Sequence, residues 1–305
     1  MGAQDMERPH HPETNFHIRV AVVLLNWNTH ERTITCVRGL LASQPCQTHI
    51  TLVDNGSTDG SVAAFRAAFP NLTVLALDQN YGYSRGVNHG IRHVLASVAP
   101  DYVLLLNNDT TLTGAILTQL ADRMDHAPHV GIATPKIIYA DAPDYLWGIG
   151  GTIYPHWLTV AGMHVRDSRE LDAFQPDFVF GCAMLIRRTV LETVGLLDER
   201  FFFSYEDIEF CLRAKQAGFG IAYFPEITVL HDGGNSTHGR GYLREYYMAR
   251  SRTQFFRHWS HGINFIKFLL RESLYVGGTV VRCVLRGDVK TMVWYLKGWL
   301  EGLTK

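Results

Sequence analysis

Side chains that can bind a metal ion or a nucleotide follow apolar segments of this sequence. Asp54 ends the run ITLVD, Asn80 comes shortly after LTVLAL, and Asp109 follows YVLLLNN. Strands buried on both faces appear as continuous apolar runs, in which Asn and Asp are disfavoured. Asp54 could accept two hydrogen bonds from a ribose or a base. The alternative is a tight turn with a solvated carboxylate.

The segment LLLNNDT supplies one carboxylate, Asp109, beside the amides of Asn107 and Asn108. A metal site there needs further ligands. The candidates are phosphate oxygens of a bound ligand and His231, which follows the apolar run ITVL. Carboxylate, imidazole and phosphate oxygens together suit Mn²⁺ and also accept Mg²⁺. The alternatives are a helix N-cap for Asp109 and a hydrogen-bonded core histidine for His231.

The segment NYGYSRGVNHG places three glycines four residues apart, which lets a helix approach a sheet or a ligand closely. Arg85 lies in the first turn of the predicted helix, where a cation opposes the positive end of the helix dipole. A bound anion would reverse that unfavourable interaction. Arg85 is therefore predicted to face a phosphate, with Asn88 one turn further on as a second donor-binding candidate.

The segment FFFSYEDIEF places Glu206 and Asp207 at the start of a helix, after an aromatic run. One of the two could be a general base whose pKa is raised by apolar surroundings. Acidic residues in a first helical turn also complement the helix dipole, so a purely structural role remains open. Glu209 is expected to face solvent or Arg213.

The elements that must position these residues alternate along residues 18–134. Apolar strands are followed by predicted helices at 31–43, 59–69 and 83–97, which indicates an α/β fold with a mostly parallel sheet flanked by helices. Ligands of such sheets gather beyond the carboxyl ends of the strands. Residues 136–174 suggest short strands and loops. Strands are predicted at 178–188 and 227–230, with helices at 189–194 and 206–217.

The composition indicates a globular chain with an acidic body and a basic end. The 305 residues are 47% hydrophobic and 19% charged, and residues 239–305 contain 12 Lys and Arg against 4 Asp and Glu. Residues 1–17 are interpreted as a flexible tail with no signal-peptide pattern. The five cysteines form no CxxC pair, which suggests reduced thiols in the cytoplasm.

The basic C-terminal segment, residues 239–305, is predicted to form amphipathic helices. No apolar run reaches the roughly 20 residues of a spanning helix. The helices are expected to contact an anionic inner membrane peripherally. The alternative is packing on the body or against a second subunit of a homodimer. Nucleic-acid binding is not expected, because the aromatic residues alternate with aliphatic ones as in packing helices.

Six segments in the same order resemble the family 2 inverting glycosyltransferases of the GT-A fold, near their rhamnosyltransferase-like branch. They are NWN at 26–28, VDNGSTDGS, NYGYSRGVNHG, LLLNNDT, the stretch from GCAMLIRR to CLRAKQAG, and VLHDGGNS. The resemblance covers residues 18–238. It implies a GT-A catalytic domain that transfers a sugar from a nucleotide-diphosphate sugar, dTDP-rhamnose or a UDP-sugar, to a glycan or lipid-linked acceptor in cell-surface polysaccharide synthesis.

The resemblance also implies roles for individual residues. Asn26 and Asp54 would line the nucleotide pocket, with Asp54 holding the base or ribose, and Arg85 would lie near the diphosphate. Asn108 is a further candidate for donor binding. Asp109 matches the last position of the family's DXD metal motif, and His231 matches the late histidine that completes the metal shell. Asp207 matches the catalytic base.

The first aspartate of the DXD motif is replaced by Asn107. Losing that charge should weaken metal binding before the donor arrives. Two other functions remain open: a nucleotidyltransferase that makes sugar nucleotides, and a non-catalytic module that binds sugar nucleotides or membranes. The first would need a glycine-rich basic loop after the first strand, where this chain has NWNTHERT.

Overall fold

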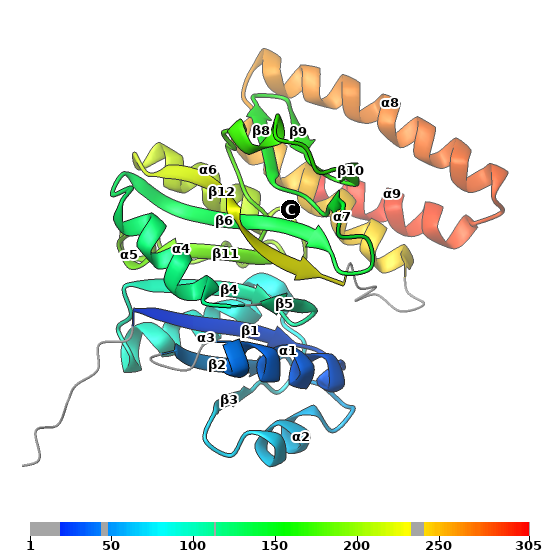
Figure 1. The fold of residues 1–305 in the computed structure, drawn as a ribbon. Coiled ribbons are helices and arrows are strands. Elements are labelled where there is room, and N and C mark those ends of the chain that lie inside the picture. The colour runs from blue at the N-terminus through cyan, green and yellow to red at the C-terminus, as the bar shows by residue number, and fades with distance from the viewer. Residues whose placement is uncertain (1–18, 44–47, 113, 233–240, 305) are drawn as a thin grey trace, which may run out of the picture.

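The computed structural model describes residues 19–43, 48–112, 114–232 and 241–304, so the predicted tail of residues 1–17 lies outside the described residues. Within these ranges a large mixed sheet is flanked by helices, with three further helices at the C-terminal end (Figure 1). The predicted α/β class is confirmed.

The strands of the large sheet follow the order β10-β7-β6-β11-β4-β1-β2-β3, with β12 pairing with β5 and β6. Strands β1 to β4 pair in parallel, β11 is antiparallel to its neighbours β4 and β6, and β12 runs parallel to β6. The strands are β1 (Val20–Asn26), β2 (Thr48–Asp54), β3 (Thr73–Ala76), β4 (Tyr102–Asn107), β5 (Thr110–Leu112), β6 (Val130–Tyr139), β7 (Tyr145–Leu146), β10 (Val165–Arg166), β11 (Ala183–Arg187) and β12 (Gly220–His231). A separate hairpin consists of β8 (Gly150–Tyr154) and β9 (Trp157–Ala161).

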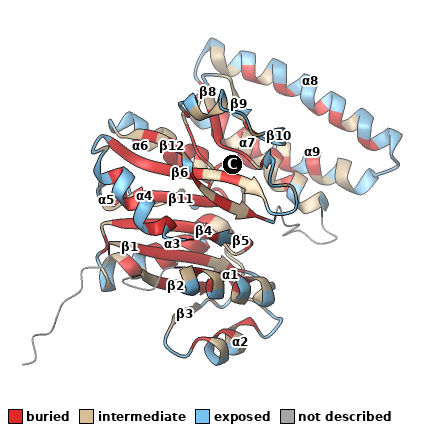
Figure 2. Cartoon of the chain, in the orientation of Figure 1, coloured by how far each residue is buried: buried red, intermediate tan, exposed pale blue. Residues whose placement is uncertain are grey.

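Both faces of the sheet are covered because neighbouring residues of a strand point to opposite sides. In β1, Val22 and Leu24 enter one buried apolar cluster, while Ala21 and Val23 enter another. The first cluster is covered by α1 (His30–Ser43), α2 (Ser61–Ala68) and α4 (Ile116–Asp125), and the second by α3 (Tyr83–Ser97), α5 (Arg188–Val194) and α6 (Glu206–Gln216). The buried strands stand out in Figure 2.

Two of the predicted strands differ from the structure. The strand predicted at 178–188 begins only at Ala183, because Phe178 forms an isolated bridge to Gly151 and the chain turns before entering β11. The strand predicted at 227–230 is the end of the longer β12. Its register shifts between Phe224 and Thr228, around Pro225, which has no N–H to donate to a sheet.

The C-terminal helices are α7 (Gly241–Trp259), α8 (Ile263–Leu285) and α9 (Val289–Thr304). Phe255 and Phe256 of α7 belong to the same apolar cluster as α6, so α7 packs on the body of the protein. Among the described residues, no helix combines the length and the apolar character needed to cross a bilayer. The four described cysteines are buried and form no disulfide.

Helices α7 and α9 pack closely because glycines face the contact. A Cβ atom added to Gly298 would lie 2.2 Å from the carbonyl oxygen of Tyr246, and one added to Gly302 would lie 2.6 Å from that of Arg250. Polar side chains also join these helices. Arg252 of α7 donates to Glu272 of α8 and to the Tyr295 hydroxyl of α9. This ion pair ties all three helices together.

We expect Gly298→Ala to lower the free energy of unfolding by about 1–3 kcal/mol, because the methyl group forces the two helices apart. Gly277 in α8 is the matched control, since a Cβ there meets nothing within 4 Å. Gly277→Ala should be neutral or stabilising by up to about 1 kcal/mol, through helix propensity. Urea unfolding of both variants checks this, and equal effects would contradict the packing described.

Candidate functional site

The pairing of β5 with β12 places Asp109 next to His231. Asp109 directly precedes β5, His231 ends β12, and the antiparallel register sets His231 opposite Thr110. The backbone N–H of Asp232 donates to the carbonyl oxygen of Asp109 at 2.9 Å. As a result, Nε2 of His231 lies 3.2 Å from Oδ1 of Asp109, and both side chains are buried. The structure thus brings together the two predicted metal ligands.

The geometry of this pair fits one divalent ion. Two ligand atoms at right angles around an ion, each at about 2.1 Å, stand about 3 Å apart. Burial acts to raise the pKa of Asp109, but the hydrogen bond and charge of His231 lower it overall, so the carboxylate is ionised. Among the described residues, no cluster of three or more His, Cys, Asp or Glu could hold a metal ion. A bound ion would need further ligands from a substrate.

An open depression of about 280 Å³ lies beside Asp109. Its lining includes Asn108, Asp232 and Arg32 of α1. Arg32 also contributes to lowering the pKa of Asp109. The sequence reasoning missed Arg32, although its place just after the NWN segment was a usable signal.

The predicted base, Asp207, is half-buried at the start of α6. Its Oδ2 accepts the backbone N–H of Gly181 at 3.0 Å, and its Oδ1 accepts that of Ile208 at 2.8 Å. Burial raises the pKa of Asp207, and these two donors oppose the rise. Burial, followed by the charge of Asp207, raises the pKa of Glu206 well above its ordinary value. Among the described residues Oε2 of Glu206 has no hydrogen-bond partner, whereas both carboxylate oxygens of Asp207 accept backbone N–H groups.

A short stretch of backbone connects Asp207 with the Asp109 region. Gly181 binds Asp207 through its N–H, and the carbonyl oxygen of the next residue, Cys182, accepts the N–H of Asn107 at 2.9 Å. The Tyr83 hydroxyl donates to the carbonyl oxygen of Gly181 at 3.0 Å. Burial, then the charges of Glu206 and Asp207, raise the pKa of Tyr83 well above its ordinary value. Tyr83 is a neutral donor at this site that the sequence reasoning had not singled out.

The turn before Asp207 is strained. Ser204 and Tyr205 are consecutive non-glycine residues with φ of 67° and 73°. Such conformations cost about 1–3 kcal/mol each and persist only where the surroundings enforce them. Here Ser251 of α7 donates to the carbonyl oxygen of Phe203 at 2.9 Å, and the ring of Tyr205 lies 5.6 Å from that of Phe255. Helix α7 therefore holds the turn that presents Asp207.

The first residues of α3 also hold the turn that precedes Asp207. The N–H of Tyr83 donates to the carbonyl oxygen of Phe202 at 2.7 Å, and the Ser84 hydroxyl donates to that of Phe201 at 2.6 Å. A side chain at Gly82, with φ of 83°, would collide with Phe202. The glycine is thus required by close packing against the turn.

Asn26 and Asp54 form a buried network at the ends of β1 and β2. The Asn26 amide nitrogen donates to Oδ1 of Asp54 at 2.8 Å, and its amide oxygen accepts from Thr33. The second carboxylate oxygen of Asp54 accepts the N–H of Ser57 at 3.0 Å. Asn26 is 0% and Asp54 1% exposed. In the structure both residues fix the loops that follow the strands, and their predicted contacts with the donor stay predictions.

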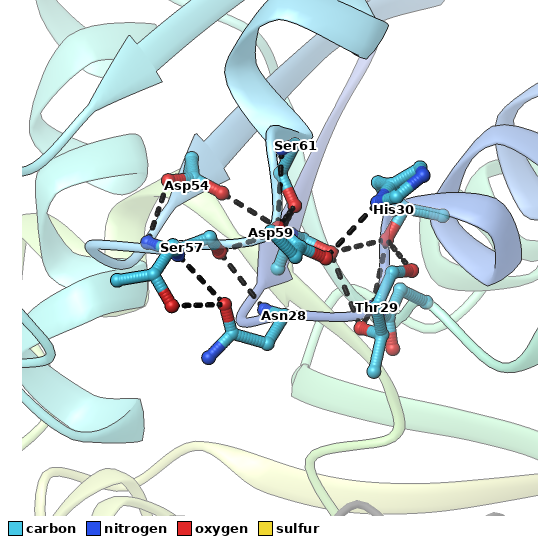
Figure 3. Close-up of polar contacts among 11 residues, drawn as sticks. Asn28, Thr29, His30, Asp54, Ser57, Asp59 and Ser61 are labelled. Atoms are coloured by element: carbon cyan, nitrogen blue, oxygen red, sulfur yellow. Dashed lines mark hydrogen bonds and ion pairs between the residues drawn. The ribbon is translucent and has the colours of Figure 1, made fainter.

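Figure 3 shows how these two loops are tied together. The N–H of Asn28 donates to the Ser57 hydroxyl at 2.9 Å, and the N–H of Thr58 donates to the Asn28 amide oxygen at 2.8 Å. Asp59 bonds both His30 and Ser61. Burial opposes these contacts, but hydrogen bonds from Ser61 and His30 hold the pKa of Asp59 at about 2. These hydrogen bonds fix the two loops in place next to the ends of β1 and β2.

Three other predicted residues have observable partners. Arg85 lies over the Tyr81 ring at 4.0 Å, with its Nε 3.8 Å from Glu199, so its charge is partly balanced within the protein. Asn88 is fully buried and bonds both backbone groups of Leu197. It holds the loop before α6, and the donor contact predicted for it stays a prediction. Asn108 donates to Thr29 and Thr33 at 2.8 Å and lines the depression.

Glu209 was expected to face solvent or Arg213, and the structure selects Arg213. The carboxylate is 2% exposed and accepts from Nε of Arg213 at 2.8 Å. The guanidinium also donates to the carbonyl oxygen of Leu196, which ties the last turn of α6 to the segment that follows α5. The last four residues of the segment VLHDGGNS, residues 233–236, lie outside the described residues.

The fold with this arrangement is that of GT-A glycosyltransferases. A mannosyltransferase from Pyrobaculum calidifontis, solved with GDP-Man and Mn²⁺, has a TM-score of 0.57 over 95% of this chain and 88% of that one, at 13% identity. GalNAc-T7, solved with UDP, GalNAc and Mn²⁺, has a TM-score of 0.55 over 77% of this chain and 51% of that one, also at 13% identity.

The sequence profile described as "Glycosyltransferase like family 2" matches residues 17–255, and the chain belongs to this family. An N-acetylglucosaminyl-diphospho-decaprenol L-rhamnosyltransferase of Mycobacterium tuberculosis is 30% identical over 62% of this chain and 67% of its own length. A dTDP-rhamnosyl transferase of Shigella flexneri, RfbF, is 24% identical over 70% of this chain and 68% of its own. The predicted family and its rhamnosyltransferase-like branch are confirmed.

We expect Ser251→Ala to lower the kcat of sugar transfer roughly tenfold while leaving the KM for the donor unchanged. The variant removes the hydrogen bond that fixes Phe203, four residues before Asp207, and leaves the strand ends intact. Ser273→Ala is the matched control, because Ser273 is exposed and, among the described residues, its hydroxyl bonds the backbone of its own helix α8. A KM change of the same size as the kcat change would show that α7 does not position the base.

Proposed function

We propose that this protein is a metal-dependent inverting glycosyltransferase. It moves a sugar, with rhamnose as the best candidate, from a nucleotide-diphosphate sugar to a hydroxyl of a glycan or lipid-linked acceptor in cell-surface polysaccharide synthesis. The observation that supports it most is the pairing of Asp109 with His231, connected through Cys182 and Gly181 to Asp207. The rhamnosyltransferase names of two relatives favour dTDP-rhamnose over a UDP-sugar as the donor.

Asp109 and His231 would hold Mn²⁺ or Mg²⁺ together with the donor's diphosphate. When bound, the ion acts as a Lewis acid that stabilises charge developing on the leaving nucleoside diphosphate. Asn107 supplies no carboxylate, so the protein contributes few charged ligands and the diphosphate must complete the site. Asp109 contributes its ionised carboxylate, and the buried surroundings keep its interactions with charge strong.

Asp207 would act as the general base. An acceptor hydroxyl is a weak nucleophile, and a carboxylate at hydrogen-bond distance removes its proton as the oxygen attacks the anomeric carbon. The bond to the diphosphate oxygen breaks as the new glycosidic bond forms, so the anomeric configuration inverts. The N–H groups of Gly181 and Ile208 orient the carboxylate, and burial, followed by the charge of Asp207, raises the pKa of the neighbouring Glu206.

The donor would lie along the ends of β1, β2 and β4. Asn108 and Arg32 border the depression there. Arg85, half-exposed on the first turn of α3, would contact the diphosphate. Asn26 and Asp54 hold the loops that would bind the nucleotide. Asp54 is the candidate for hydrogen bonds to the ribose or the base. The enzyme would work in the cytoplasm, where nucleotide sugars serve an acceptor at the inner face of the membrane.

We expect Asp207→Asn to lower kcat by about 10²–10⁴-fold, because the amide cannot take the acceptor proton. Donor binding should stay within a few-fold of wild type, since the metal pair and the loops are untouched. Asp144→Asn is the matched control, because Asp144 is exposed and its ion pair with Arg166 is 3.6 Å long. Transfer assays and calorimetry of nucleotide binding separate the two effects; wild-type turnover in Asp207→Asn would assign the base elsewhere.

The proposed metal site predicts that Mn²⁺ binds weakly alone and more tightly with a nucleoside diphosphate. Calorimetric titration of Mn²⁺ with and without dTDP or UDP measures this. The nucleotide that gives the tighter Mn²⁺ binding is also the one expected in the donor. His231→Ala should weaken Mn²⁺ binding in the ternary complex at least about tenfold. His261→Ala, at an exposed histidine, is the control. Full transfer activity after removal of all divalent cations would refute metal dependence.

A further inference from the structure

Helix α8 carries a continuous apolar surface on the side that faces away from the protein. Ile266, Leu270, Leu274, Val281 and Leu285 recur at intervals of four or seven residues and lie on one side of the helix, and we call them the α8 stripe. Leu274 is 80% and Leu285 82% exposed. The opposite side of α8 is buried: Val276 packs with Ala249 of α7 and Tyr295 of α9, and Cys283 is also buried. Figure 2 shows the exposed outer side of α8.

The charges beside the α8 stripe are all positive. Lys267, Arg271, Arg282 and Arg286 are exposed, and a rotation of 100° per residue places them along one edge of the stripe. The only acidic residue between positions 263 and 287 is Glu272, which is 4% exposed and paired with Arg252. The outer surface of α8 thus combines apolar side chains with an uncompensated row of cations.

Aromatic side chains of the β8–β9 hairpin lie next to this surface. The guanidinium of Arg271 lies 4.4 Å over the ring of Trp157, which stacks on Tyr154 at 4.6 Å. Tyr154 is 39% exposed. Trp and Tyr with an apolar ring and a polar edge are typical of membrane–water interfaces. The hairpin extends the apolar and basic surface beyond α8 itself.

We propose that the α8 stripe binds an anionic lipid surface, with α8 lying in the plane of the headgroups. Leucine and isoleucine side chains would enter the boundary of the acyl chains, and the row of cations would contact lipid phosphates. The positive charge argues against a second copy as the occupant. In an antiparallel two-fold pairing of α8 centred between positions 276 and 277, Arg271 of one chain faces Arg282 of the other, and Lys267 faces Arg286. Such like-charge pairs oppose association.

This proposal depends only on the exposed surface of α8 and not on sugar transfer. It accounts for the excess of basic residues in the C-terminal segment, which the proposed catalytic residues do not use. It would also bring the body of the protein to a membrane without any spanning helix.

The test is flotation of the full-length protein with vesicles of phosphatidylcholine alone or mixed with phosphatidylglycerol. We expect binding to the anionic vesicles, weakened by added salt, and little binding to the neutral ones. Arg282→Ser combined with Arg286→Ser should weaken binding roughly 30-fold, and Leu270→Ser combined with Leu274→Ser should abolish it. Leu41→Ser combined with Arg66→Ser, an exposed apolar and basic pair on α1 and α2, should bind like wild type.

Equal binding to both vesicle types, no binding by the wild type, or unchanged binding by the α8 variants would each overturn the proposal. Sedimentation of the protein without lipid provides an independent check. A stable dimer that Leu270→Ser with Leu274→Ser dissociates would assign the α8 stripe to a second copy instead. Thermal unfolding of each variant identifies any that fails to fold. If a variant fails, the dependence of wild-type binding on anionic lipid and on salt still tests the proposal.

Discussion

The site depends on the antiparallel pairing of a three-residue strand, β5, with the end of β12. This pairing joins segments more than 100 residues apart and buries a carboxylate against an imidazole. Burying an ionised group is costly unless it is paired, so Asp109 and His231 stabilise each other in the absence of a ligand. The same pairing fixes both side chains before a ligand arrives, which reduces the ordering cost of binding.

The second half of the site depends on helices outside the sheet. The turn that precedes Asp207 is strained at Ser204 and Tyr205, and contacts from α3 and α7 hold it. Helix α7 is held in turn by α8 and α9 through the pair of Arg252 with Glu272 and through glycines at the α7–α9 contact. The C-terminal helices therefore support the sheet-based site, and their outer surface is left for a different contact.

Much of the fold could be predicted from sequence because its signals are local. The apolar runs of β2 and β4 and the helix of residues 83–97 were predicted close to their observed bounds, since each combines a clear apolar pattern with nearby glycines or polar residues. The segment of residues 178–182 was predicted wrongly as a strand, because its apolar composition does not reveal that its backbone turns to meet Asp207.

Some residues of the site could likewise be predicted from sequence and others could not. The closeness of Asp109 and His231 could be proposed from residue types that suit a metal, and the structure places them together. The buried network of Asn26 and the loop contacts of Asn88 could not be predicted, because burial depends on which strands and loops pack around them. The partner of Arg85, Glu199, is more than 100 residues distant in sequence, and no local pattern indicates their contact.

The central claim is that Asp109 and His231 hold a divalent ion that also binds the diphosphate of the donor. Anomalous X-ray diffraction from crystals grown with Mn²⁺ and a nucleoside diphosphate tests it most directly. The account predicts one strong manganese peak within ligand distance of Oδ1 or Oδ2 of Asp109, Nε2 of His231 and phosphate oxygens. A peak elsewhere, or a diphosphate bound away from these two side chains, would contradict it.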